Sequence, residues 1–246
     1  MGSHECERGT EECVRYVKRR DSRMTKERTG IAIEHLAVTI PVESILLEGD
    51  LSIPTSASGA VLFAHGSGSS RRSPRNRYVA DLLNESGLAT LLMDLLTEDE
   101  QQVDLQTAHL RFDIPLLGKR LVAITQWLAE HPEVAGMKIG HFGASTGAAA
   151  ALVAAAELPR VVHAVVSRGG RPDLAGQALS HVKAPTLLIV GGADPVVLDL
   201  NQQALGLMHC EKSLKVVPGA THLFEEPGAI EKVAALARDW FVEKLS

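Results

Sequence analysis

Residues 137–157, "MKIGHFGASTGAAAALVAAAE", join an apolar run to an alanine-rich run through a serine that lies between two glycines. The apolar run is typical of a buried strand, and the alanine-rich run favours a helix. Between them, the pattern Gly-x-Ser-x-Gly predicts a sharp strand-to-helix turn that leaves the serine hydroxyl exposed. Ser145 is therefore either a nucleophile held on this turn or the N-cap of the helix, a role that serine also fills well.

Other apolar stretches of strand length recur along the chain, and with residues 137–142 they make eight. Helical patterns lie between the later ones, which predicts an α/β fold: a mostly parallel sheet with helices on both faces. The first two stretches are expected to form an antiparallel edge. The seven other stretches are 35–40, 45–53, 61–65, 88–94, 161–167, 186–192 and 213–219.

Three predicted helices have clear signals. The first has Ser73 as N-cap, Pro74 at its first position and Gly87 just beyond its end. A second helix is expected to stop near His131, and a third near the C-terminus has one apolar face. The apolar positions are Leu117, Leu121, Ile124 and Leu128 in the second helix, and Ile230, Val233, Ala234, Ala237, Trp240 and Phe241 in the third.

The composition predicts one soluble domain. The chain has 246 residues, 45% hydrophobic and 22% charged, with a net charge of -5. Residues 31–246 are long enough for a single α/β domain, whereas the highly charged residues 1–30 are expected to be a disordered or loosely helical arm. A mildly acidic chain without a long basic stripe disfavours nucleic acid as a partner. No run reaches 18 apolar residues, so we expect no membrane association and a cytoplasmic location.

The three cysteines, Cys6, Cys13 and Cys210, match neither a zinc site nor a disulfide framework. We therefore predict no metal site from them.

In a parallel sheet, ligands bind outside the carboxyl ends of the strands. A serine hydroxyl at that edge needs a base to take its proton and a group to orient the base. His222 follows the last predicted strand in a loop of small residues, and Asp194 follows the strand 186–192. The alternatives are a solvated loop histidine and an aspartate that caps the next helix; Asp194 could also fill both roles. Together, Ser145, Asp194 and His222 occur in the order Ser, Asp, His.

The strand at 61–65 opens into a loop rich in glycine and serine, "HGSGSSRRS" at 65–73. Acyl transfer develops an oxyanion, which backbone N–H groups stabilise when they are aimed at it in advance. The expected pair is the N–H of Ser67 and that of Thr146, the residue after the nucleophile. A phosphate-binding turn is the alternative, but the loop has neither the P-loop spacing nor GxGxxG, which disfavours nucleotide binding.

From about residue 35 to the C-terminus, these residues resemble the α/β-hydrolase superfamily, and within it the small dienelactone hydrolase-like group. The resemblance implies an α/β-hydrolase fold with an eight-stranded sheet. Only 18 residues, 168–185, separate two of the strands, which is too few for a large cap domain. Dienelactone hydrolases proper have a cysteine nucleophile, whereas Ser145 stands here, so the resemblance implies a serine esterase.

Two arginines near the predicted edge, Arg71 and Arg168, could bind an anionic substrate; the alternative is that both are solvated surface side chains. Asp94 closes a strand and could serve as a second candidate for the acid, or could hydrogen-bond the neighbouring loop.

These features predict a hydrolase that cleaves carboxylic esters through an acyl-enzyme and that acts on a small-molecule ester, with lactones as a further candidate substrate. No cofactor or metal is expected, and the protein would be a monomer or a homodimer. The same residues would also serve a thioesterase or an acyltransferase. A non-catalytic α/β-hydrolase-fold protein that binds a small ligand is the alternative from another class.

Overall fold

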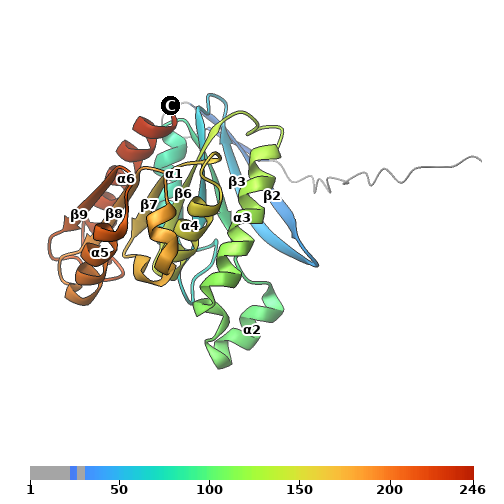
Figure 1. The fold of residues 1–246 in the computed structure, drawn as a ribbon. Coiled ribbons are helices and arrows are strands. Elements are labelled where there is room, and N and C mark those ends of the chain that lie inside the picture. The colour runs from blue at the N-terminus through green and yellow to red at the C-terminus, as the bar shows by residue number, and fades with distance from the viewer. Residues whose placement is uncertain (1–22, 27–30) are drawn as a thin grey trace, which may run out of the picture.

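The computed structural model describes residues 23–26 and 31–246, which contain one nine-stranded sheet in the order β1-β2-β3-β5-β4-β6-β7-β8-β9 (Figure 1). The strands are β1 (Arg23–Lys26), β2 (Ala32–Val42), β3 (Ile45–Pro54), β4 (Gly59–Ala64), β5 (Leu88–Met93), β6 (Lys138–Ala144), β7 (Val162–Arg168), β8 (Thr186–Gly191) and β9 (Lys212–Val217). The helices are α1 (Pro74–Glu85), α2 (Glu98–Thr107), η1 (Leu110–Phe112), α3 (Ile114–Glu130), α4 (Thr146–Glu157), η2 (Pro172–His181), α5 (Pro195–Leu207) and α6 (Ala229–Leu245), where η marks 3₁₀ segments.

The sheet is parallel from β5 to β9 and antiparallel from β1 to β3, and β3 pairs antiparallel with β5. Strands β2 to β9 are the eight predicted from the apolar stretches, and the expected antiparallel edge is β2 and β3. The ninth strand, β1, pairs with β2 from Arg23↔His35 to Lys26↔Ala32.

Strand β1 lies inside the stretch assigned to a disordered or loosely helical arm, so that assignment is wrong for Arg23–Lys26. Its sequence, RMTK, has too little apolar character to signal a strand, and its pairing comes from the open edge of β2. The rest of the predicted arm, residues 1–22 and 27–30, falls outside the described residues.

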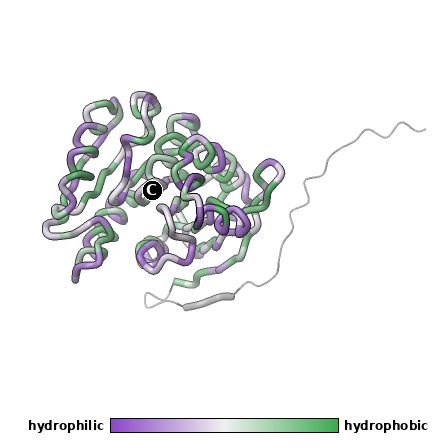
Figure 2. The backbone as a smooth tube through the Cα atoms, turned by 90° about the horizontal axis from the view of Figure 1, so that it is seen from below, coloured by the Kyte–Doolittle hydropathy of each residue, from purple (hydrophilic) through white to green (hydrophobic). Residues whose placement is uncertain are grey.

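Helices cover both faces of the sheet, and two apolar clusters form the core. One cluster joins one face of the sheet to α1 and α6, and the other joins the opposite face to α3, α4 and η2. Figure 1 shows α3, α4 and α5 in front of the strands. Along the outer helices in Figure 2, hydrophobic and hydrophilic stretches alternate, as expected for helices with one buried face.

The predicted helix signals correspond to the observed ends. Helix α1 begins at Pro74 with Ser73 as N-cap, whose hydroxyl accepts from the Asn76 N–H, and Gly87 follows the helix with a φ of 78°. The apolar positions predicted for α3 are buried, and α6 buries Val233, Ala234, Ala237 and Phe241.

Helix α2 and the η1 turn were not predicted. Helix α2 is strongly polar and buries only Asp104, so it has no apolar periodicity. A signal was nevertheless available in the capping box of Thr97 and Glu100, which satisfies backbone groups at the helix start. Arg120 of α3 ties Glu100 to the body of the protein through two bonds of 2.6 and 2.7 Å. Figure 1 shows α2 projecting beyond the lower end of the sheet.

Candidate active site

Ser145 stands on a strained turn between β6 and α4. Its backbone has φ 49° and ψ -121°, a conformation that a residue with a side chain rarely adopts. The turn is held from both sides, because the Ser145 N–H donates to the Arg168 carbonyl at 3.3 Å and the Ser145 carbonyl accepts the Arg171 N–H at 3.0 Å. The Ser145 side chain makes no capping hydrogen bond to α4. Its hydroxyl is therefore presented away from the helix.

The two glycines of the motif are needed because strand and helix nearly touch. A Cβ on Gly143 would lie 2.4 Å from the Cα of Ala148, and one on Gly147 would lie 2.3 Å from the carbonyl oxygen of Ala64. Both obstacles are backbone atoms, which cannot rotate away. Close packing at these two positions thus forces the turn that presents Ser145.

The structure brings Ser145, His222 and Asp194 together in one chain of hydrogen bonds. His222 Nδ1 lies 2.9 Å from Asp194 Oδ2, and His222 Nε2 lies 3.3 Å from Ser145 Oγ. The Asp194 carboxylate can only accept, so Nδ1 carries the proton and donates it. This leaves Nε2 as an acceptor facing the serine hydroxyl.

Asp194 makes both of the contacts that its position allowed. Its Oδ1 accepts the Val197 N–H at 3.4 Å as N-cap of α5, while Oδ2 holds the His222 ring. The two oxygens of one carboxylate thus fix it to the helix start and to the imidazole at once. The side chain of His222 is 37% exposed and that of Asp194 17%, so solvent reaches the ring while the carboxylate is more sheltered.

Ser67 and Thr146, expected to supply the two backbone N–H groups, also lie side by side. The Ser67 and Thr146 hydroxyl oxygens are 3.0 Å apart. Thr146 is the first residue of α4, so its N–H has no acceptor within the helix and lies at the positive end of the helix dipole. Gly66 fits closely here, since a Cβ on it would lie 2.9 Å from the Cβ of Ser145.

His65 fixes the start of the loop that carries Ser67 through hydrogen bonds. The sequence analysis did not predict this role. Its Nδ1–H donates to the Gly66 carbonyl at 2.9 Å, and its Nε2 accepts the Leu95 N–H at 3.1 Å. Burial lowers the pKa of His65, which keeps the ring neutral and able to accept at Nε2. The signal was its position directly after β4 and directly before Gly66.

Arg71 is not available for an anionic substrate, because carboxylates surround its guanidinium. It pairs with Asp94, with Glu48 at 2.6 Å and with Asp50 at 3.7 Å. Burial of Arg71 opposes its charge, but these three carboxylates outweigh burial and raise its pKa. Asp94 Oδ1 also accepts the Arg71 N–H at 2.8 Å, so Asp94 makes the loop hydrogen bond rather than orienting His222. Glu48 and Asp50 come from β3 and Asp94 follows β5, so the structure pairs the Arg71 guanidinium with protein carboxylates instead of leaving it free for the predicted anionic substrate.

Arg168 lies at the end of β7 and is buried rather than solvated, with 5% of its surface exposed. Its Nη2 donates to Asn76 Oδ1 at 3.3 Å, and its guanidinium lies 5.8 Å from the ring centre of Phe224. Burial, together with the nearby charge of Arg75, lowers the pKa of Arg168 to about 10. Among the described residues no carboxylate forms an ion pair with it. Arg168 is thus a buried positive charge beneath the start of α1.

Within residues 23–26 and 31–246, no group of three or more His, Cys, Asp or Glu side chains is arranged to hold a metal ion. No helix in the same part of the chain is long and apolar enough to cross a bilayer.

The fold and the strained serine turn define the class: this is an α/β-hydrolase fold without a large cap domain, as the sequence resemblance implied. The sequence model of the dienelactone hydrolase family matches residues 49–244, and the chain belongs to that family.

Among solved structures, a dienelactone hydrolase from Anabaena variabilis is 59% identical, with a TM-score of 0.85 over 87% of this chain and 99% of that one. A cold-adapted esterase from an Arctic intertidal metagenomic library is 16% identical, with a TM-score of 0.71 over 91% of this chain and 98% of its own, and shows the fold alone.

Two curated relatives from strains of Mycobacterium tuberculosis are 58% identical over 209 residues. They carry the provisional name phosphoribosyl transferase. The match covers 85% of this chain and 46% of theirs, so the chain spans about half the length of these relatives.

Proposed function

We propose that this hydrolase cleaves carboxylic esters through an acyl-enzyme formed on Ser145. The observation that carries the proposal is the chain of hydrogen bonds from Ser145 Oγ to His222 to Asp194, at the carboxyl edge of a parallel sheet. Such an arrangement activates a weak nucleophile by placing a base beside it and an orienting carboxylate behind the base.

In the first step, Ser145 Oγ attacks the ester carbonyl while His222 Nε2 takes the hydroxyl proton. A C–O bond forms to Ser145 and the carbonyl electrons move to oxygen. Asp194 stabilises the imidazolium and does not take the proton. When the tetrahedral intermediate collapses, the bond to the alcohol breaks and His222 returns the proton to the leaving oxygen. Water then repeats the sequence and releases the acid.

The oxyanion is held by the backbone N–H groups of Ser67 and Thr146. Thr146 directly follows Ser145 in the chain, and its hydroxyl oxygen lies 3.0 Å from that of Ser67, which supports this assignment. Because the loop and the helix start are fixed before substrate arrives, these donors need no reorganisation when charge develops.

The name of the curated relatives belongs to proteins about twice as long as this chain. In the part that they share with it, the contacts of Ser145, His222 and Asp194 favour hydrolysis over transfer of a phosphoribosyl group.

A fluorophosphonate probe tests the nucleophile directly, since it reacts with an activated serine. Labelling is expected in the wild type and in Ser86→Ala, and is expected to be lost in Ser145→Ala. Ser86 is a suitable control because its hydroxyl donates to Leu82 at the opposite end of α1. No labelling of the wild-type protein, with the chain folded, contradicts the proposal.

A panel of matched esters, lactones and thioesters then tests the substrate class. Hydrolysis of short-chain p-nitrophenyl esters, with release of the acid, supports the carboxylesterase. Faster turnover of thioesters would indicate a thioesterase instead of a carboxylesterase. Acyl transfer to an added alcohol in place of hydrolysis would indicate an acyltransferase.

A further inference from the structure

A cavity of ≈ 480 Å³ lies beside the loop that carries Ser67. That loop, the start of α1 and the α2–η1 segment form its walls, and Thr146 also lines it. Gly66, which also lines it, packs against Ser145. An ester bound at Ser145 could thus extend one of its substituents into this cavity.

The cavity is positively charged although the protein is acidic overall. Its lining holds three arginines, Arg72, Arg75 and Arg111, against one carboxylate, Asp104. His65 adds no charge, because burial lowers its pKa. The lining has a formal charge of +2, whereas the whole chain has -5.

The three arginines differ in how far protein carboxylates occupy them. The Arg72 guanidinium has no hydrogen bond or ion pair with the described residues, and its side chain is exposed. Arg75 pairs with Glu225 at 2.8 Å through Nη1 only, and its buried Nε has no partner among the described residues.

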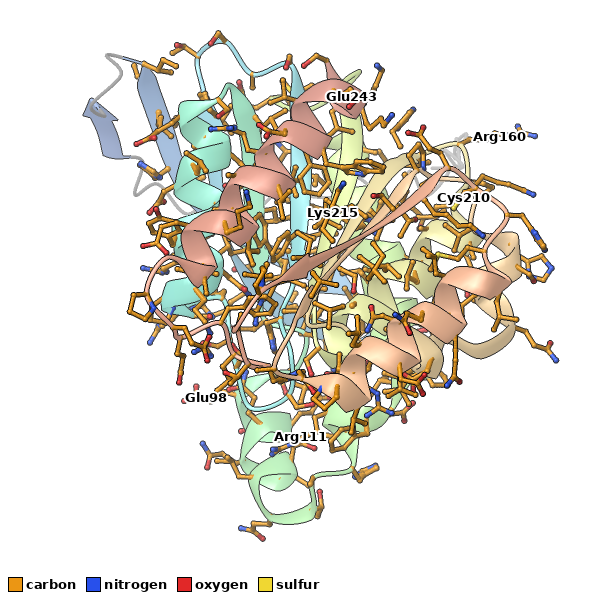
Figure 3. The ribbon with its side chains drawn as sticks, turned by 90° about the vertical axis from the view of Figure 1, so that its left-hand side faces the viewer. Glu98, Arg111, Arg160, Cys210, Lys215 and Glu243 are labelled. Carbon is orange, nitrogen blue, oxygen red and sulfur yellow. The ribbon has the colours of Figure 1, made fainter. Side chains whose placement is uncertain are left out.

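Arg111 pairs with Asp104 through Nε at 2.6 Å. Its Nη1 would lie 3.8 Å from a Cβ on Gly68, so this nitrogen reaches the serine loop. Figure 3 shows Arg111 at the base of the molecule, next to α2.

Hydroxyl groups add uncharged donors around the same space. The Ser70 hydroxyl accepts the Arg72 N–H at 3.2 Å, and the Ser73 hydroxyl accepts the Asn76 N–H at 3.5 Å. Because both oxygens act as acceptors in these bonds, each hydroxyl hydrogen remains available for a ligand. Ser69 adds a third hydroxyl, and the dipole of the twelve-residue α1 begins at the same wall.

Arg168 adds a buried positive charge close enough to interact with Arg75, which lines the cavity. It is buried without a carboxylate partner among the described residues, and it touches Asn76 in the first turn of α1. A buried charge without a partner is costly, and an anion bound in the cavity would lower that cost.

We propose that this cavity binds a phosphate group on the ester substrate, with Arg72, Arg75 and Arg111 as the charged donors. This inference rests on the proposed function, since the ester carbonyl must lie at Ser145 while the phosphate lies in the cavity. A phosphate fits this lining better than a carboxylate. Its tetrahedral oxygens accept bonds from several directions, and here arginines and hydroxyls come from α1, from the serine loop and from η1.

Two matched substrates test the inference: 1-acetylglycerol 3-phosphate and 1-acetylglycerol. The wild type is expected to show a kcat/KM about tenfold or more higher for the phosphorylated ester, as for a charge-assisted hydrogen bond. In Arg72→Gln this ratio is expected to fall to about threefold or less, and Arg72→Lys is expected to retain part of it. Arg77→Gln is the matched control, since it removes an exposed arginine of α1 outside the cavity and is expected to keep the wild-type ratio.

Equal turnover of the two esters, or a preference for an acetylated glycerate over the phosphate, overturns the inference and leaves the proposed function intact. A binding measurement further separates a failure of the phosphate site from a failure of the proposed function. Calorimetric titration of the Ser145→Ala protein with inorganic phosphate is expected to show binding that Arg72→Gln abolishes. If phosphate binds in this way but the wild-type protein hydrolyses no ester, the phosphate site is supported and the proposed function is contradicted. No binding to the Ser145→Ala protein overturns the phosphate site.

Discussion

The two sides of the candidate site are built in opposite ways. The turn around Ser145 is so closely packed that Gly143 and Gly147 have no room for a Cβ. The loop from Ser67 to Arg72 borders the cavity, and the nearest atom to a Cβ on Gly68 is an arginine nitrogen at 3.8 Å. The tight side fixes the position of the reacting oxygen, whereas the open side leaves room for a substrate. We therefore expect substitutions on the tight side to affect catalysis and folding, and those on the open side to affect specificity.

The largest expected effect comes from removing the base on the tight side. His222→Ala is predicted to lower kcat for a p-nitrophenyl ester by about 10⁴- to 10⁶-fold, equivalent to about 5 to 8 kcal/mol. The reason is that no other described group accepts the Ser145 proton. Steady-state kinetics measure it, with unfolding curves to show that the variant is folded. A rate near that of the wild type would remove His222 from the mechanism.

A smaller but still large effect is expected from adding a side chain at the closely packed turn around Ser145. Gly147→Ala places a Cβ 2.3 Å from a backbone oxygen, so α4 must shift away from β4. The predicted loss is about 3 kcal/mol in the free energy of unfolding. Urea denaturation measures the loss, and esterase assays are expected to show a parallel fall in activity. An unchanged urea midpoint would show that the turn around Ser145 has room for a Cβ at position 147.

Acid is predicted to destabilise the core where β6 packs against α3 and α4. His141 is fully buried, with Nε2 3.0 Å from the Thr125 hydroxyl and Nδ1 3.3 Å from the Ala151 carbonyl. Burial lowers its pKa from 6.5 to about 4, so protonation favours the unfolded chain. The neutral His141 therefore contributes its full stabilisation above pH 6.5, and this contribution is lost as the pH falls towards 4.

The loss attributable to His141 is about 3 kcal/mol. Urea unfolding at pH 7 and pH 4.5 measures it. In His141→Gln, which cannot titrate, the free energy of unfolding is expected to change less between these pH values. An equally steep loss in that variant would assign the acid sensitivity to other groups.

The smallest effect is predicted where a glycine lies in open space. Nothing lies within 4 Å of a Cβ on Gly206 in α5, and its backbone φ is not positive. Gly206→Ala is therefore expected to stabilise the protein by about 0.5 kcal/mol through reduced freedom of the unfolded chain. Thermal unfolding measures this, and a destabilisation like that of Gly147→Ala would remove the contrast between the two positions.

Much of the fold was predictable because buried strands and amphipathic helices have local patterns. The eight apolar stretches form β2 to β9, and Ser73, Pro74 and Gly87 were enough to predict where α1 begins and ends. What could not be predicted lacked such a pattern. Strand β1 depends on the free edge of β2, and α2 buries only Asp104 while its Val103 and Leu105 are exposed, so neither element shows apolar periodicity.

The sequence by itself determined the order of Ser145, Asp194 and His222 and their places after strands, because turns, caps and strand ends are local. Only the tertiary structure decided what surrounds each charge. Arg71 and Arg168 look alike in the sequence. Among the described residues, however, three carboxylates form ion pairs with Arg71 and none forms an ion pair with Arg168. The physical reason is that electrostatic environment is set by distance in space, and β3, β5 and α1 bring their side chains together only when the sheet has formed.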